Sequence, residues 1–182
     1  MRSPARSPAR EKPPDMPIVS FEMLPAESRL WVFGVERALG HEEQESFLRA
    51  VDGFLESWVA HGSPLRCGRD WRRGRFLLIA VDDASIPPSG CSIDAMVRVL
   101  KDQEKELAVE ILDNSPVWFL VNDEIRRVSR KEFGDLARSG AVGPDTVVFD
   151  NTVTRLAEER SGGWERPAGE SWHGKAFFGR LS

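Results

Sequence analysis

Hydrophobic residues in the first half of the chain follow first a strand-like and then a helix-like spacing. An apolar run over residues 29–35 predicts a short strand. Apolar residues on one helical stripe then predict a helix that ends at Ala60, His61 and Gly62, because Gly62 suits the left-handed conformation after a helix and Pro64 cannot continue one. The members of this stripe are Phe47, Leu48, Val51, Phe54, Leu55, Trp58 and Val59.

The next part of the pattern predicts a hairpin and a second helix. Residues 65–71 and the apolar run 75–81 flank a turn at residues 72–74, which is typical of an antiparallel hairpin. A helix that runs to about residue 107 is predicted by a second apolar stripe, which consists of Ile93, Met96, Val97, Leu100 and Leu107. We expect a fourth strand at residues 109–112 or at residues 117–121.

The resulting order of strand, helix, strand, strand, helix and strand is that of the ferredoxin-like split βαβ plan, an α+β fold with an antiparallel sheet. In this plan the first helix ends, and the second helix begins, at the same end of the sheet. We therefore expect His61 and Cys91 to be neighbours, although they lie far apart in the sequence.

The pattern changes after residue 112. A strand over residues 116–121 places Trp118 and Phe119 on opposite faces. Ser129 and Glu132 have the spacing of a capping box, which predicts a helix that stops at Gly140. A further strand is expected at residues 147–149.

These changes divide the chain into three expected segments, which are a disordered tail (1–17), a ferredoxin-like α+β domain (18–112) and a small C-terminal α+β subdomain (113–182). Over residues 116–168 the last segment resembles the GYF-related small modules of bacterial proteins. The resemblance implies protein contacts through aromatic surfaces, here around Trp118 or Trp164. The aromatic signature with which true GYF domains bind proline-rich peptides is absent.

Charge and composition narrow the functional classes. The formal charge of the chain is −4, and the tail carries +2, so the remainder carries −6, which argues against nucleic-acid binding. No segment approaches the roughly 20 apolar residues that span a bilayer, and we expect a cytoplasmic protein. Two cysteines and three histidines give no zinc pattern, so we expect thiols, no metal site and no cofactor.

The chemically most suggestive stretch runs from Ser89 to Asp94, where a strand gives way to the second helix. A helix N-terminus stabilises a thiolate, and a helix C-terminus stabilises an imidazolium. Cys91 and His61 are therefore the candidate catalytic pair of a cysteine nucleophile. The imidazole would be oriented by one of three carboxylates, which are Asp82, Asp83 and Asp94.

Two other interpretations of this stretch stay open. Free cysteines are often buried and His-Gly is a common helix ending, so both residues can be structural. Alternatively, the helix N-terminus binds a small anion or a phosphorylated ligand without covalent chemistry. The ligand-binding residues would then be Ser89, Gly90, Ser92 and Asp94.

A second constellation surrounds Trp71 and consists of Arg66, Arg69, Arg72, Arg73 and Arg75. Arginine interleaved with an aromatic residue can bind phosphates and stacked bases. Arginines at alternating strand positions are more often a solvated sheet face or a protected edge, and the acidic charge of the chain favours this second interpretation.

Residues 169–175 match the spacing of a Walker A loop, but Ala176 stands where that loop needs a hydroxyl group, and no preceding buried strand is expected. The pair Trp172 and His173 is instead expected to anchor the C-terminus, with the indole packed and its N–H bonded.

Segments across most of the chain resemble a family of small bacterial proteins of Bacteroidetes type that often carry the label "ABC transporter ATPase". The matching strings are Leu30-Trp31-Val32, Trp58 to Leu65, Ala80-Val81-Asp82, Ser89 to Asp94, Thr146 to Asn151, and Trp164 through His173. The family has no established activity. Its label implies Walker A and B motifs, which this sequence lacks.

Three functions are therefore expected, in this order. The first is a non-enzymatic cytoplasmic binding or adaptor protein that contacts a protein or peptide partner through the C-terminal subdomain. The second is a cysteine-centred enzyme or redox protein that uses Cys91 and His61. The third is a protein that binds a small anionic ligand at the N-terminus of the second helix.

Overall fold

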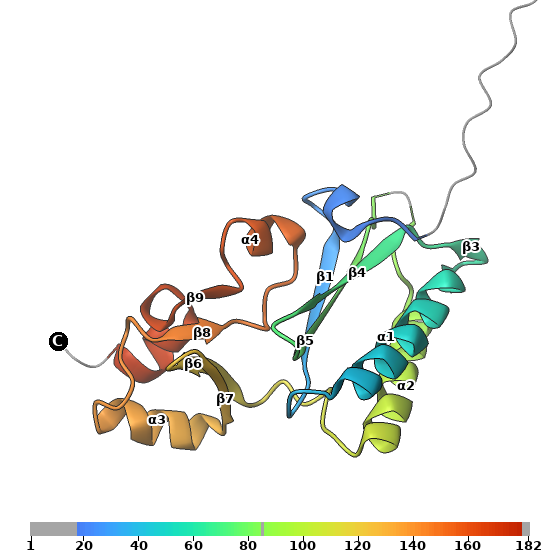
Figure 1. Cartoon of the computed structure of the whole chain (residues 1–182). Coiled ribbons are helices and arrows are strands. Elements are labelled where there is room, and N and C mark those ends of the chain that lie inside the picture. Colours follow the sequence, from blue (N-terminus) through green and yellow to red (C-terminus); the bar gives the residue numbers. More distant parts are fainter. Residues whose placement is uncertain (1–17, 85, 180–182) are drawn as a thin grey trace, which may run out of the picture.

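The first sheet forms from the three apolar runs of the first half. In a computed structural model that describes residues 18–84 and 86–179, strands β1 (Arg29–Gly34), β5 (Phe76–Val81) and β4 (Cys67–Arg72) lie side by side in this order and are antiparallel (Figure 1). The predicted strands and their hairpin are thus confirmed. The tail predicted at residues 1–17 lies outside the described residues.

Two helices cover one face of this sheet, namely α1 (His41–Glu56) and α2 (Gly90–Leu107) (Figure 1). The stripe of α1 packs with the inward residues of β1 and β5, and the buried members of this cluster include Phe33, Phe47, Val51, Leu55, Leu77, Ile79, Met96 and Leu100. The helix predicted to end near residue 107 does end there.

The predicted end of the first helix is wrong. Helix α1 stops at Glu56, and strands β2 (Val59–Ala60) and β3 (Ser63–Pro64) form a short hairpin after it. His61 and Gly62 are the two turn residues, with φ of 51° and 78°. A two-residue hairpin turn of type I′ has positive φ at both central positions, a conformation that glycine adopts freely. Gly62 therefore closes a hairpin, and His61 does not lie at a helix C-terminus.

The predicted fourth strand is also absent from the first sheet. Glu104 accepts hydrogen bonds from the N–H groups of Ile111 and Leu112, both at 2.8 Å, so a side chain holds this backbone instead of a strand partner. The place beside β1 is taken in part by the C-terminal half, because the N–H of Leu30 donates to the carbonyl of Thr154 at 2.8 Å. Residues 117–121 are a strand, but they belong to the second sheet.

The second sheet contains β7 (Glu124–Val128), β6 (Val117–Val121), β8 (Val147–Phe149) and β9 (Glu165–Pro167), in this order and antiparallel. Helix α3 (Arg130–Arg138) packs on one face of it. The capping box is confirmed, since Ser129 Oγ accepts from the N–H of Glu132 at 3.2 Å and Glu132 accepts from the N–H of Ser129 at 2.8 Å.

The other face of the second sheet meets the first sheet. One buried cluster joins Leu30, Val32, Phe76, Leu78 and Ala80 of the first sheet to Trp118, Phe149, Val153, Leu156 and Trp164 of the C-terminal half. The short helix α4 (Leu156–Arg160) contributes to this cluster. We call the buried cluster between the two sheets the seam. Trp118 and Phe119 lie in different clusters, which confirms that they occupy opposite faces.

The expected aromatic surface is not present. Trp118 and Trp164 are each only 2% exposed, because both indoles fill the seam between the two sheets. Trp118 lies so close to Gly34 that a Cβ atom there would come within 2.6 Å of the indole. No helix in residues 18–84 or 86–179 is long and apolar enough to cross a membrane.

Candidate functional site

The start of α2 has the geometry of a capped helix. Of the two serines that the sequence offers as the N-cap, Ser89 and Ser92, the structure has Ser89, and its hydroxyl accepts from the N–H of Ser92 at 3.1 Å. The hydroxyl of Ser92 donates to the carbonyl of Ser89 at 2.8 Å. Both serine side chains proposed as ligand donors are therefore engaged in the cap, and Ser92 is buried.

A buried hydrogen bond joins this cap to the region after α1. The indole of Trp58 donates to the carbonyl of Ser92 at 2.8 Å, and β2 contacts α2. The end of the first helix and the start of the second thus meet at the same end of the sheet, as the strand order predicts. Two of the strings that carry the family resemblance are packed together here.

The residues of the proposed catalytic pair both lie at the surface. Gly90, Cys91, Asp94 and His61 are all exposed, and within residues 18–84 and 86–179 no hydrogen bond links Cys91 with His61. Two of the three carboxylates expected to orient the imidazole have other partners, since Asp82 pairs with Arg66 at 3.0 Å and Asp83 with Arg155 at 3.0 Å.

The second cysteine is chemically protected. Cys67 lies in the first hydrophobic cluster and is fully buried, and this burial raises the pKa of its thiol to about 12. A thiol with such a pKa is protonated and unreactive at neutral pH. In the described chain, no group of three or more His, Cys, Asp and Glu residues could hold a metal ion.

The five arginines around Trp71 are not a free basic face. Arg66 and Arg69 pair with carboxylates, Arg69 with Asp52 at 2.6 Å. Arg72 and Arg73 reach across the seam to Glu159 and Glu165 of the C-terminal half. The interpretation as a solvated sheet face is therefore wrong for this pair, because they join the two halves. Their charge is already compensated, which leaves little of it for phosphate groups.

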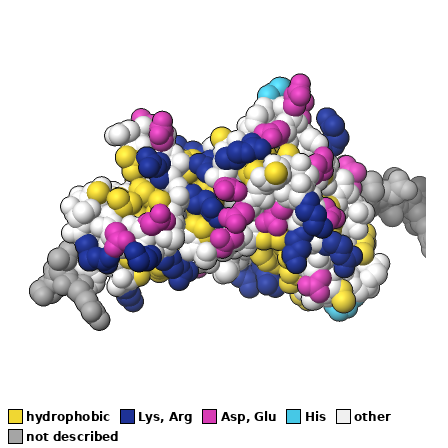
Figure 2. All heavy atoms as spheres, turned by 90° about the horizontal axis from the view of Figure 1, so that it is seen from below, with side chains coloured by type: hydrophobic (Ala, Val, Ile, Leu, Met, Phe, Trp, Pro, Cys, Tyr) yellow, Lys and Arg dark blue, Asp and Glu magenta, His cyan; other side chains and the backbone are white. Residues whose placement is uncertain are grey.

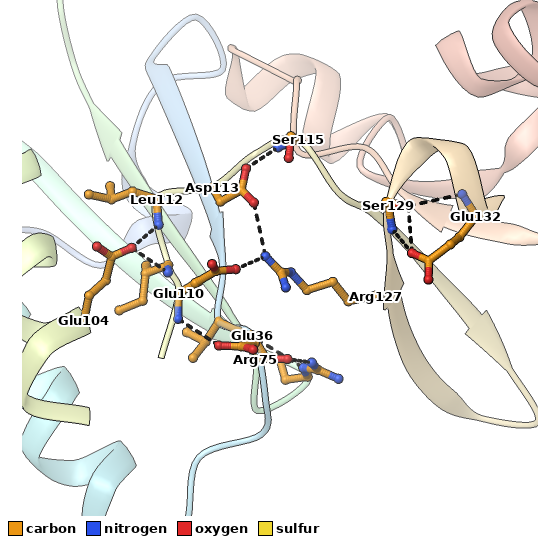
Figure 3. Close-up of polar contacts among 12 residues, drawn as sticks. Glu36, Arg75, Glu104, Glu110, Leu112, Asp113, Ser115, Arg127, Ser129 and Glu132 are labelled. Atoms are coloured by element: carbon orange, nitrogen blue, oxygen red, sulfur yellow. Dashed lines mark hydrogen bonds and ion pairs between the residues drawn. The ribbon is translucent and has the colours of Figure 1, made fainter. Parts of the chain in front are cut away.

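A further arginine cluster holds residues 108–116, the linker between α2 and β6 that joins the two halves of the chain. Figure 3 shows Arg127 reaching from β7 to Glu110 and Asp113 of the linker. Arg75 donates to the carbonyl of Ile125 at 2.8 Å. The guanidinium groups of Arg75 and Arg127 lie 5.0 and 5.7 Å from the ring centroid of Trp118. These contacts fix the seam. A hollow of about 310 Å³ beside Arg127 is lined by the same carboxylates that already pair with it.

A larger and more enclosed hollow lies elsewhere in the described chain, between α3 and the turn at its end. This groove has a volume of about 830 Å³. Its lining consists of Gly134, Ala137, Arg138, Ser139, Gly140, Lys175, Ala176, Phe177 and Gly179. Small side chains make up much of the lining, and Phe177 supplies an apolar surface.

One wall of the groove is an unusual element, the π-helical turn η3 (Gly174–Phe178). Such turns are rare and occur frequently at functional sites. Stacked rings anchor it, since His173 stacks on Trp172 at 3.9 Å between centroids and Phe177 meets Phe133 of α3 at 5.0 Å. Trp172 and His173 thus pack as expected, but the indole N–H of Trp172 is buried without the predicted hydrogen bond.

His173 is the buried titratable group behind this wall. Its side chain is 1% exposed, and its Nδ1 lies 2.7 Å from the hydroxyl of Ser171. Burial lowers the pKa of His173 to about 4, Asp150 opposes this shift, and Arg130 and Arg166 reinforce it. The ring is therefore neutral near pH 7 and serves packing.

The charged residues in the lining of the groove are Arg138 and Lys175, both positive. Asp135 of α3 pairs with both Lys131, at 3.2 Å, and Arg138, and these cations lower the pKa of its carboxyl. Lys175 has no ion pair among the described residues. Figure 2 shows charges of both signs over the molecule seen from below, with several Lys and Arg side chains at the end that carries α3 in Figure 1.

The sequence pattern did not reveal this groove. The helix of α3 is predictable from its capping box, and its small residues Gly134, Ala137 and Gly140 are visible in the sequence. The opposite wall is a π-helical turn, which has no periodic hydrophobic signature in a five-residue segment.

Comparison of the chain with models of protein families, with curated proteins and with solved structures gives no match.

Proposed function

We propose that this chain is a non-enzymatic binding or adaptor protein, which holds a peptide segment of a protein partner in the groove between α3 and η3. The observation that supports the proposal is the groove itself. Its volume of about 830 Å³ lies within the range of about 300–1,000 Å³ typical of ligand sites. It combines an apolar surface with a small number of polar groups, as such sites do.

The lining favours a peptide over a compact small molecule. Ala137 and Gly140 place little or no side chain at the C-terminal end of α3, so a main chain can approach the helix closely there, whereas Gly134 is buried beside Phe177. Half-buried Phe177 offers a contact for one apolar side chain. Arg138 and Lys175 offer donors to carbonyl or carboxylate oxygens at the rim.

We also propose a ferredoxin-like fold for the first half of the chain and a GYF-like fold for the second. The order β1, β5, β4 with two helices on one face supports a ferredoxin-like half that lacks its fourth strand. A GYF-like second half fits a role in protein contacts, with the difference that the contact surface is the groove and not exposed indoles.

A random 12-residue peptide library displayed on phage tests the proposal. The full chain is immobilised, and selected peptides are tested on a variant with a blocked groove, Ser139→Trp. Ser57→Trp is the matched control, because both serines are exposed helix C-caps whose hydroxyls bond a carbonyl three residues earlier. We expect enriched peptides that bind the wild type and Ser57→Trp but not Ser139→Trp. No enrichment, or equal binding by Ser139→Trp, would overturn the proposal.

A cysteine-centred activity is the second candidate, and the exposure of Cys91 in the first turn of α2 favours it. The test is the rate of alkylation of Cys91 against pH in the wild type and in His61→Ala. Buried Cys67 does not compete for the reagent. This function is supported if the pKa of the Cys91 thiol lies well below the value of roughly 8.5 for a free cysteine and rises when His61 is replaced. A profile that His61→Ala leaves unchanged excludes the pair.

A further inference from the structure

The groove carries a charge imbalance that points to the chemistry of its occupant. Lys131 and Arg138 share the single carboxylate of Asp135, and Lys175 stands on the opposite wall without an ion pair in the described chain. The lining of the groove thus includes two cations, Arg138 and Lys175, and no carboxylate. An anion is attracted more strongly by cations on both walls of a concave site than by the same cations on a flat surface.

We propose that the segment that binds in this groove is acidic, with carboxylates at Arg138 and Lys175 and an apolar side chain on Phe177. This inference rests on the proposed function and adds the class of partner. Arg138 presents a planar guanidinium that can donate to a carboxylate through two N–H groups, whereas Lys175 acts as a point charge. Together they define a two-point contact on opposite walls.

Two other occupants fit the charges less well. The N-terminal segment of this chain, residues 1–17, carries +2 and would be repelled by the same cations. A nucleic acid would meet a chain whose remaining residues carry −6. An acidic peptide needs only the local cations of the groove, because its charged groups are few and short.

Fluorescence anisotropy with defined peptides tests the inference. The probes are fluorescein-labelled 12-residue peptides that repeat Glu-Leu-Ser, Gln-Leu-Ser or Lys-Leu-Ser, and a labelled 12-nucleotide oligothymidylate. The protein variants are the full chain, the double charge reversal Arg138→Glu with Lys175→Glu, and the control reversal Arg98→Glu with Lys101→Glu. Both control residues are exposed on α2, so this control carries the same change in net charge away from the groove.

We expect the Glu peptide to bind the wild type at least about tenfold more tightly than the Gln peptide, and to lose most of this preference at high salt. The reversal at Arg138 and Lys175 should shift the preference to the Lys peptide. The control reversal should leave the Glu peptide in first place.

The remaining outcomes separate the inference from the proposed function. If the phage selection yields neutral peptides and the Glu and Gln peptides bind equally, the inference is wrong and the peptide-binding function stands. If the oligothymidylate displaces the Glu peptide at equal concentration, the site is one for nucleic acid and the inference is wrong. If neither the library nor any defined peptide binds, both proposals fail.

Discussion

The start of α2 and the groove beside α3 both combine a helix end with polar side chains, but they differ in how much of that polarity is already used. At α2 the serine hydroxyls are bonded within the cap, and the carbonyl of Ser92 accepts the indole N–H of Trp58. At the groove, Lys175 and Arg138 keep donors that no described carboxylate saturates. The residue types in the sequence suggested a site at the start of α2. The free N–H donors of Lys175 and Arg138 in the described chain indicate a site at the groove instead.

This difference has a simple physical basis. A buried polar group costs free energy unless it is bonded, so a well-folded helix start uses its own hydroxyls. An exposed cation costs little free energy when it has no ion-pair partner, so it remains available to bind a ligand. A binding site is therefore expected where charged side chains are exposed on a concave surface. It is not expected where the polar groups of a motif already form hydrogen bonds with one another.

The start of α2 depends on the hydrogen bond from Trp58 to Ser92, so the loss of this bond should destabilise the chain strongly. Trp58→Phe removes the indole N–H and with it the buried hydrogen bond to the carbonyl of Ser92, which keeps only its partner within the helix. We expect a loss of about 2–3 kcal/mol in the free energy of unfolding, from the lost hydrogen bond and the smaller ring. Urea denaturation measures it.

Trp71→Phe is the matched control for this experiment. The indole N–H of Trp71 is buried without a partner, so its removal relieves a cost that offsets part of the lost packing. We expect it to lose less stability than Trp58→Phe. Equal losses would show that ring volume alone matters, and the bond from Trp58 to Ser92 would then contribute nothing to the integrity of α2.

The second prediction concerns the wall of the groove and its dependence on pH. The pKa of His173 is about 4 in the folded chain and near 6.5 in an unfolded one, because burial opposes the charged form. The unfolded state thus binds the proton first as the pH falls. Stability is complete above about pH 6.5 and decreases toward pH 4. The linkage gives about 3.4 kcal/mol, which we reduce to about 2 because half-exposed Ser171 and Trp172 admit screening water.

His173→Phe isolates this contribution. The variant keeps an aromatic ring beside Trp172 and removes the titrating group, so its stability should change less between pH 7.5 and pH 4.5 than that of the wild type. Unfolding in urea at several pH values measures the difference. His41→Ala, at an exposed position paired with Glu45, controls for the loss of a histidine as such. Parallel pH profiles of His173→Phe and the wild type would contradict the assignment.

The third prediction compares the two helix caps directly. Ser89→Ala and Ser129→Ala each remove a hydroxyl that accepts from an N–H in the first turn, and each should cost about 1 kcal/mol. Only the second loss also frees the carboxylate of Glu132 from its hydroxyl partner. Peptide binding should respond to neither variant, because neither serine lines the groove. A drop in affinity for Ser89→Ala alone would return attention to α2.

Much of the fold was predictable because its elements have strong local signals. The apolar run 76–81, the capping box at Ser129 and the helical stripe of α2 all specified elements that the structure contains. The end of α1 was not, since Trp58 and Val59 extend the helical stripe by chance while the positive φ values of His61 and Gly62 close a hairpin. Chain geometry, and not periodicity, decides such a boundary.

The site was less predictable for a different reason. Sequence order correctly brought the end of α1 toward the start of α2, but it could not show that Asp82 and Asp83 pair with arginines distant in sequence. The pairing of Arg72 with Glu159 and the seam around Trp118 are equally non-local. Only the folded structure shows which charged side chains already have an ion-pair partner. For the same reason the groove became visible only in three dimensions.

The smallest expected effect separates folding from binding at the groove itself. Gly134→Ala places a methyl group on α3, where its nearest neighbours would be Arg138 and Phe177 at 3.5 and 3.6 Å, which are ordinary contacts. Gly53→Ala on α1 meets nothing within 4 Å and is the control. Both should raise stability by about 0.5–1 kcal/mol, because alanine costs less backbone entropy in a helix.

Binding should then separate the two glycine variants, since only the methyl group at residue 134 occupies space in the groove. We expect Gly134→Ala to bind the Glu-containing peptide more weakly than Gly53→Ala does, although both chains are more stable than the wild type. Thermal unfolding and anisotropy on the same samples give the two quantities. A loss of stability in Gly134→Ala would mean that α3 and the π-helical turn are already in tight contact. The groove would then have no room for a peptide main chain at this point.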